Sequence, residues 1–160
     1  KALTYLEESQ NAYRELNMPD GVAACFLNIG IVYKNLGQYD KALLSYEEGL
    51  KIFREIKIPE LVKHPAYPPA FRRAMEKHFE RAIPASIAVA LGNIANIYLL
   101  SEDYEKALSY ANESLKTVTT LDLPYMTASR LHKIGEIYLA QKRYKEAEEK
   151  FYEANMQYEK

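Results

Sequence analysis

Apolar residues recur with helical periodicity along most of the chain, in segments separated by short polar turns such as "NLGQ" and "SED". Within a segment they fall at positions i, i+3, i+4 and i+7, which lie on one face of an α-helix. The pattern therefore predicts pairs of antiparallel helices joined by tight turns. Two consecutive segments show it, at Phe26, Ile29, Gly30 and Tyr33, and then at Ala42, Tyr46, Leu50 and Phe53.

The same arrangement occurs three times with the same internal spacing. When "NIGIVYKNLGQYDKALLSY", "NIANIYLLSEDYEKALSYA" and "KIGEIYLAQKRYKEAEEKF" are aligned, two tyrosines and an alanine recur in register. A fourth, truncated copy opens the chain, so we expect the chain to start in mid-repeat. The aligned residues are Tyr33, Tyr98 and Tyr138, then Tyr39, Tyr104 and Tyr144, then Ala42, Ala107 and Ala147.

Pairs of an apolar residue and a proline separate the repeats, because proline ends one helix and suits the first turn of the next. These pairs are Met18-Pro19, Ile58-Pro59, Ile83-Pro84 and Leu123-Pro124. We therefore predict a single array over residues 1–160. Its parts are the second helix of a truncated repeat (1–18), a repeat (19–59), an insert (60–84) with a helix at about 69–82, and two repeats (84–123 and 124–160).

The insert is inferred from the spacing of the tyrosines. Tyr98 to Tyr138 spans 40 residues whereas Tyr33 to Tyr98 spans 65, so 65 − 40 = 25 residues are extra. We expect Glu60 to Pro68 to be extended, and a helix to begin at Pro69 and to be stopped by Pro84. An apolar stripe follows this helix at Phe71, Ala74, Met75, Phe79 and Ala82.

Three interpretations of the insert helix stay open. In the first, it is a buttress whose apolar stripe covers the repeats, with Arg72, Arg73, Lys77 and Arg81 facing water. In the second, it occupies a binding groove as a resident pseudo-ligand. In the third, it binds a partner through a contact surface of Phe71, Arg72, Met75 and Phe79.

The repeated positions resemble the tetratricopeptide repeat (TPR) family, which places a large apolar residue, Leu, Gly, Tyr, Ala, an aromatic and Ala at fixed offsets. The resemblance covers nearly everything outside residues 60 to 84 and implies an all-α, right-handed superhelical solenoid. The period of 40 instead of the family's usual 34 resembles a subgroup common in signalling and scaffold proteins. The matching residues are Phe26, Ile29, Gly30, Tyr33, Ala42, Tyr46 and Gly49, then Leu91, Ile94, Ala95, Tyr98, Ala107, Ala111 and Ser114, then Leu131, Ile134, Gly135, Tyr138, Ala147, Phe151 and Ala154.

The resemblance also implies a ligand groove, because first helices of this fold line the inner face. Asparagine amides suit it, since they both donate and accept hydrogen bonds. The implied groove positions are Asn28, Ile31, Lys34, Asn35, Asn93, Asn96, Leu100, His132, Lys133, Glu136 and Ala140. Chaperone-binding members hold a carboxylate tail with a clamp, but Leu27, Gly92 and Ser129 stand where clamp residues are expected, so that partner is not predicted.

Two functional hypotheses follow from the resemblance. The first is a non-catalytic scaffold module that holds a protein or peptide in its groove, with rigidity between repeats lowering the ordering cost of binding. The alternative is a sensory or regulatory segment of a larger signalling or transcription-control protein, in which the insert helix occupies the groove or binds the partner. The domain context of the full-length protein would discriminate between them.

The composition and net charge limit the classes of molecule that we expect the chain to bind. The formal net charge of −1 gives no reason to expect nucleic acid or an anionic membrane as partner. No apolar segment of the sequence reaches the length of about 18 residues that a membrane span needs. Cys25, the single cysteine, is expected to be a buried thiol, and we expect a cytoplasmic protein. Self-association through the insert or uncovered end repeats is a further expectation.

Catalytic chemistry finds little support in the sequence. The three histidines, His64, His78 and His132, are scattered, so no local ligand pair predicts a metal site. A GxSxG elbow and a phosphate-binding glycine loop are both missing from the sequence. The acidic clusters fit solvated helix surfaces. We therefore predict neither enzymatic activity nor a cofactor.

Overall fold

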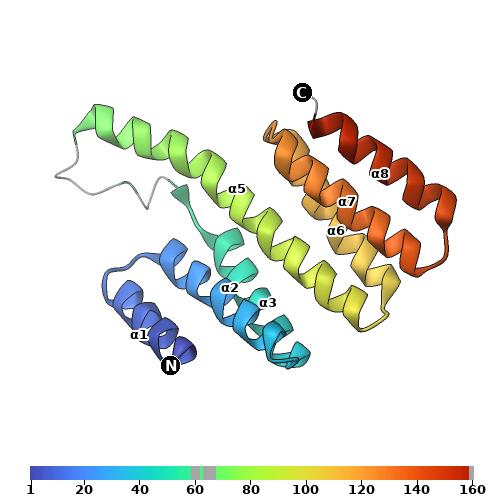
Figure 1. Cartoon of the computed structure of the whole chain (residues 1–160). Coiled ribbons are helices and arrows are strands. Elements are labelled where there is room, and N and C mark those ends of the chain that lie inside the picture. The colour runs from blue at the N-terminus through green and yellow to red at the C-terminus, as the bar shows by residue number, and fades with distance from the viewer. Residues whose placement is uncertain (59–61, 63–67, 159–160) are drawn as a thin grey trace. The chain divides into compact units, whose positions relative to one another are not determined.

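The computed structural model describes residues 1–58, 62 and 68–158 of the chain (Figure 1). These residues form α-helices joined by turns and contain no β-strand. The helices are α1 (Ala2–Glu15), α2 (Pro19–Asn35), α3 (Tyr39–Glu55), α5 (Pro69–Leu100), α6 (Tyr104–Thr120), α7 (Pro124–Ala140) and α8 (Tyr144–Tyr158). The all-helical repeat fold is confirmed, while the right-handed superhelix stays a prediction.

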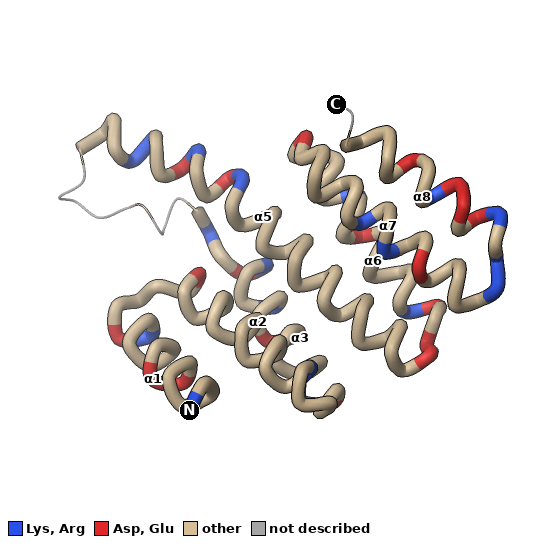
Figure 2. Tube along the Cα trace, viewed as in Figure 1, with Lys and Arg blue, Asp and Glu red and all other residues tan. Residues whose placement is uncertain are grey.

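The chain divides into two compact units, Lys1–Ile87 and Ala88–Lys160. In the first unit α2 packs against α1 and α3, and in the second α7 packs against α6 and α8. Figure 2 shows few charged residues on α2, whereas charges of both signs alternate along α8. A helix that packs against two neighbours needs apolar residues around more of its circumference than a helix that packs against one neighbour.

Small residues let the helices of each pair approach closely. A Cβ atom added at Gly30 would lie 2.5 Å from Cε1 of Tyr46, and one added at Gly135 would lie 2.6 Å from Cε1 of Phe151. These two repeats therefore need a small residue at this position. In the second unit, buried residues of α5, α6 and α7 form one core. These residues are Ala95, Ala107, Ala111, Ile134 and Ile137.

Each helix pair is closed by the same kind of turn. The first residue after the helix cap has a positive φ angle, and backbone N–H groups donate to carbonyls of the preceding helix in a Schellman arrangement. After α2, for example, the N–H of Gly37 donates to Lys34 and that of Gln38 donates to Tyr33. The positive-φ residues are Asn17, Gly37, Glu102, Asp122 and Lys142.

The insert helix differs from the prediction at its C-terminal end. It begins at Pro69 as expected, but it does not stop at Pro84, since α5 continues as one helix to Leu100. Proline lacks an N–H and so removes one backbone hydrogen bond, a local penalty. Burial of Ile83 and Ala88 on either side of Pro84 outweighs that penalty.

The continuity of α5 also corrects the expectation about membrane-length segments. By length and composition alone, α5 could cross a membrane, since one 18-residue window has a mean hydropathy of 1.6. However, 44% of this window is buried inside the protein, and core helices commonly meet the same two criteria. The predicted extended leg, Glu60 to Pro68, lies outside the described residues except for Val62, which is buried, and Pro68, which is exposed.

Candidate functional site

The candidate site of the second unit is carried by the last part of α5 and by α7. Both helices turn apolar residues toward the core, where Leu91 and Ile94 of α5 and Leu131 and Ile134 of α7 are buried. Their helical spacing leaves the predicted groove residues on another side. These residues are Asn93 and Asn96 on α5, and His132, Lys133 and Glu136 on α7, and all five are half-buried or exposed.

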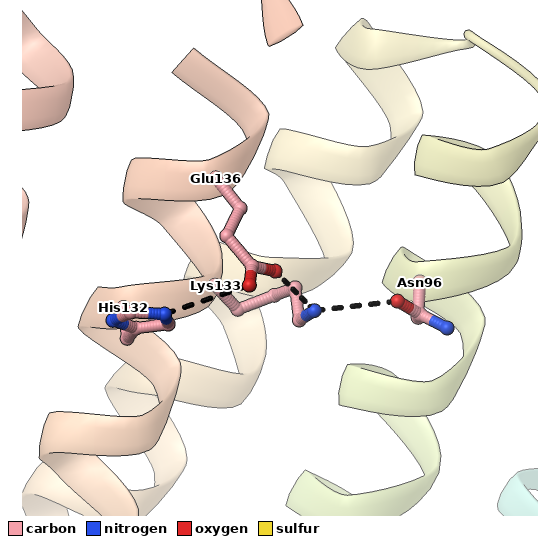
Figure 3. A network of polar contacts seen from close by, with 4 residues as sticks. All are labelled: Asn96, His132, Lys133 and Glu136. Carbon is pink, nitrogen blue, oxygen red and sulfur yellow. Dashed lines mark hydrogen bonds and ion pairs between the residues drawn. The ribbon is translucent and has the colours of Figure 1, made fainter. Parts of the chain in front are cut away.

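Four of these side chains form one polar network (Figure 3). The Lys133 ammonium donates to Oδ1 of Asn96 over 3.3 Å and also pairs with the carboxylate of Glu136. Nε2 of His132 lies 3.5 Å from the other carboxylate oxygen of Glu136. The network thus joins two first helices that are 37 residues apart in sequence. The structure brings together four residues that the sequence analysis assigned to one surface.

A ring contact anchors one end of the network. The imidazole of His132 lies 5.0 Å from the ring of Phe151, centroid to centroid, at an interplanar angle of 50°. Phe151 in turn covers Gly135, so the position of His132 is tied to the packing of α7 against α8. The polar residues are therefore held by the repeat core, which favours a surface organised before any partner arrives.

Exposed leucines lie on the same sides of α5 and α7 as the polar network. Leu100 lies one turn after Asn96 and is 48% exposed, and Leu139 lies three residues after Glu136 and is 49% exposed. Hydrogen-bonding groups beside exposed leucines can contact both the main chain and the apolar side chains of another protein. Leu100 was among the predicted groove positions, whereas Leu139 was not.

Arg130 is the residue of this site that the sequence analysis missed. Its guanidinium lies against Gly92 of α5, where an added Cβ would be 3.0 Å from Cζ. Its Nε is buried without a hydrogen-bond partner, and burial lowers the pKa of the Arg130 guanidinium. The sequence held one signal of this contact. A long cationic side chain, Arg130, stands at a position of the last repeat that usually packs against the neighbouring helix, and the preceding repeat has a glycine, Gly92.

The predicted groove residues of the first unit lie on α2. Asn28 and Asn35 are exposed, as is Ile31, and Lys34 is half-buried. Leu27 and Ile29, which flank Asn28 in the sequence, are buried. Their part in ligand binding stays a prediction.

The predicted contact surface of the insert helix lies on the first part of α5. Phe71 is 46% exposed, while Arg72, Met75 and Phe79 are half-buried. The rings of His78 and Phe79 form an edge-on contact with centroids 5.5 Å apart. Of the basic residues expected to face water, Arg73, Lys77 and Arg81 are exposed and Arg72 is not. The three interpretations of this helix stay open.

Perturbed ionisable groups of the described residues have structural causes. Hydrogen bonds with Lys106 at the start of α6 lower the pKa of Asp103. In the first turn of α8, hydrogen bonds with its own backbone N–H and with Arg143 lower the pKa of Glu146. Burial raises the pKa of the Cys25 thiol, which is buried as predicted. Within the described part of the chain, no group of three or more His, Cys, Asp or Glu side chains could hold a metal ion. His64 lies outside that part.

Comparison with known proteins bears on the family of the chain. A family model described as Tetratricopeptide repeat matches residues 1–55 and 86–154, which is more than half of the chain. The residues between the two matched segments include the whole of the predicted insert (60–84), whose status as an insert stays a prediction. A search of curated proteins found no match.

Proposed function

Because the chain belongs to the tetratricopeptide repeat family, whose repeats generally mediate protein–protein interactions, we propose that it is a non-catalytic module that binds a protein partner along α5 and α7. The bound element is an extended peptide segment of the partner. The groove residues of α2, namely Asn28, Lys34 and Asn35, extend the same binding function to the first unit.

One observation carries this proposal, the mixed polar and apolar surface on two successive first helices. Asn96 and Lys133 offer hydrogen-bonding groups to a peptide main chain, and they are linked over 3.3 Å. Leu100 and Leu139 flank them and stand exposed, although their burial in an interface would be favourable. A small-molecule site would instead require an enclosed cavity.

The test begins with the selection of binding peptides from a display library against the whole chain. Dissociation constants are then measured for Leu100→Ala, Leu139→Ala and the matched control Leu44→Ala. Leu44 is 61% exposed on α3, a second helix, so its replacement removes the same surface chemistry elsewhere.

We expect each replacement on α5 or α7 to weaken binding about tenfold, as at interface residues that carry binding energy, and Leu44→Ala to leave it unchanged. Peptides sensitive to Leu44→Ala but not to Leu100→Ala or Leu139→Ala would contradict the proposed surface. A selection that enriches no peptide would contradict peptide binding itself.

A further inference from the structure

The guanidinium of Arg130 is a half-buried positive charge without a counter-charge in the described part of the chain. It lies beside Gly92, where an added Cβ would lie 3.0 Å from Cζ and 3.1 Å from Nη1. Its Nε is buried and donates to no acceptor. A guanidinium stays charged at every physiological pH, so its partial removal from water is a cost that only an acceptor or an anion can offset.

Other half-buried cations of the second unit are paired. The Lys133 ammonium pairs with Glu136 of the same helix, and the Lys150 ammonium lies 2.7 Å from the carboxylate of Glu153. Glu136 is thus already engaged with Lys133 and His132. The described neighbours therefore leave Arg130 as a free cationic donor.

A second buried donor lies next to Gly92. Nδ2 of Asn93 is buried and has no hydrogen-bond partner. Asn93 is three residues before Asn96, so the two amides are neighbours on the same side of α5. Buried polar groups in folded proteins are almost always paired. Two unpaired N–H donors on one pair of helices indicate that the missing group is an acceptor.

Gly92 lets the Arg130 guanidinium lie close to the backbone of α5. An added Cβ at this position would meet the guanidinium at 3.0 Å, so the guanidinium itself fills the space beside the glycine. Arg130 is half-buried, so part of it stays open to solvent, and a carboxylate at the end of a flexible side chain can reach it while the partner's main chain stays on the surface. A terminal carboxylate would have to bring the main chain in with it.

We propose that the α5–α7 face of the second unit binds an aspartate or glutamate side chain of the partner, with Arg130 and Asn93 as the donors and Gly92 as the position that holds the guanidinium in place. This inference rests on the proposed function and adds the chemistry of one partner residue. Arg130 is thereby a specificity-determining residue, because a planar guanidinium recognises a carboxylate through two parallel hydrogen bonds.

Three short synthetic peptides with alternating leucine serve as probes of the whole chain. The first carries glutamate between the leucines and has both ends blocked; the second carries glutamine instead; the third is the glutamine peptide with a free carboxyl terminus. Dissociation constants and the NMR resonance of the Arg130 Nε–H group are recorded for each peptide. Arg130→Lys assigns that resonance.

We expect the glutamate peptide to bind at least about tenfold tighter than the glutamine peptide and to shift the Arg130 resonance. Arg130→Gln should abolish this preference. The control Arg143→Gln, which removes the same charge from an exposed residue paired with Glu146, should keep it. Gly92→Ala changes no charge but displaces the guanidinium, so it should reduce the preference while the helical circular dichroism spectrum stays the same.

Equal binding of the glutamate and glutamine peptides would overturn the inference, as would an equal effect of Arg143→Gln and Arg130→Gln. Preference for the peptide with the free terminus would show that a terminal carboxylate is the ligand, which also contradicts it. The proposed function is tested separately. If the glutamate and glutamine peptides bind equally and Leu100→Ala weakens the binding of both, only the carboxylate site is refuted. An Arg130-dependent preference that is insensitive to Leu100→Ala and Leu139→Ala refutes only the proposed peptide surface.

Discussion

The helix pairs α2–α3 and α7–α8 follow the same sequence pattern but differ in the aromatic residue at their closest approach. Tyr46 covers Gly30 in the first pair and Phe151 covers Gly135 in the second. Tyr46 is completely buried and its hydroxyl has no hydrogen-bond partner, whereas Phe151 is half-buried. The comparison indicates that an aromatic ring over a glycine fills the closest approach in both pairs and that the hydroxyl adds nothing to the packing.

The largest expected effect comes from filling the space under the ring. Gly30→Ala would place a Cβ 2.5 Å from the fully buried Tyr46 ring, which has little room to move. We expect an overpacking cost of about 3 kcal/mol, reduced by about 1 kcal/mol of gained helix propensity. Gly135→Ala should lower the free energy of unfolding less, because the half-buried Phe151 can shift outward. Denaturation with urea measures both.

Gly92→Ala is the matched control for these two variants. Its added Cβ would meet the end of the flexible Arg130 side chain and not a buried ring. The gain in helix propensity should therefore prevail and leave the chain as stable or more stable. If Gly30→Ala proved as stable as Gly92→Ala, close packing of the ring over glycine would not be what holds α2 and α3 together.

Replacing the unpaired hydroxyl tests the other half of the comparison. Tyr46→Phe gives the first pair the aromatic residue of the second pair and removes a buried polar atom without a partner. We expect the free energy of unfolding to rise by about 1 kcal/mol. Tyr33→Phe, at a half-buried tyrosine of the same pair, should change it by less than about 0.5 kcal/mol. A loss of stability in Tyr46→Phe would mean that the hydroxyl has a partner, such as a water molecule.

Alkaline pH provides an independent check on Tyr46. Burial raises its pKa from 10.0 to about 12 in the folded chain. Between pH 10 and pH 12 the unfolded chain releases this proton while the folded chain keeps it, so the folded state loses stability as the pH rises. Tyr46→Phe should lose less stability than the unmodified chain between pH 8 and pH 11. Equal losses would show that the hydroxyl reaches water.

The smallest effects are expected in the turns of the two pairs. Gly37 and Lys142 occupy the same turn position with φ angles of 71° and 60°, and their N–H groups make equivalent hydrogen bonds. Only glycine adopts such angles without steric cost. We expect Gly37→Ala to lower the free energy of unfolding by about 1 kcal/mol and Lys142→Gly to raise it by up to about 1 kcal/mol. Thermal unfolding measures the pair, and shifts of the same sign would contradict the argument.

The sequence predicted those parts of the fold that depend on local periodicity. The spacing of Phe26, Ile29 and Tyr33 predicted a helix where α2 lies, and Pro69 marked the start of α5. The stop at Pro84 was wrong because one lost backbone hydrogen bond is a local cost, while the burial that outweighs it depends on tertiary packing. Sequence alone does not rank these two contributions.

The sequence predicted which residues belong to the candidate site but not how their side chains contact one another. The repeat register placed Asn96, Lys133 and Glu136 on first helices, and the structure adds that Lys133 bridges the other two. Arg130 escaped the sequence analysis because it occupies a position that usually packs against the neighbouring helix. Its significance depends on the contact with Gly92, which lies 38 residues earlier and has no side chain to signal it.

The boundary between the two compact units falls between Ile87 and Ala88, inside the uninterrupted helix α5. Proteases usually separate structural units at exposed, irregular linkers. Here the bond at the boundary lies within the hydrogen-bonded backbone of a helix and is protected from cleavage until α5 unwinds. A fragment that carries the second unit should therefore keep the whole of α5 and start at Pro69, so that its terminus is the natural start of a helix and not a cut within one.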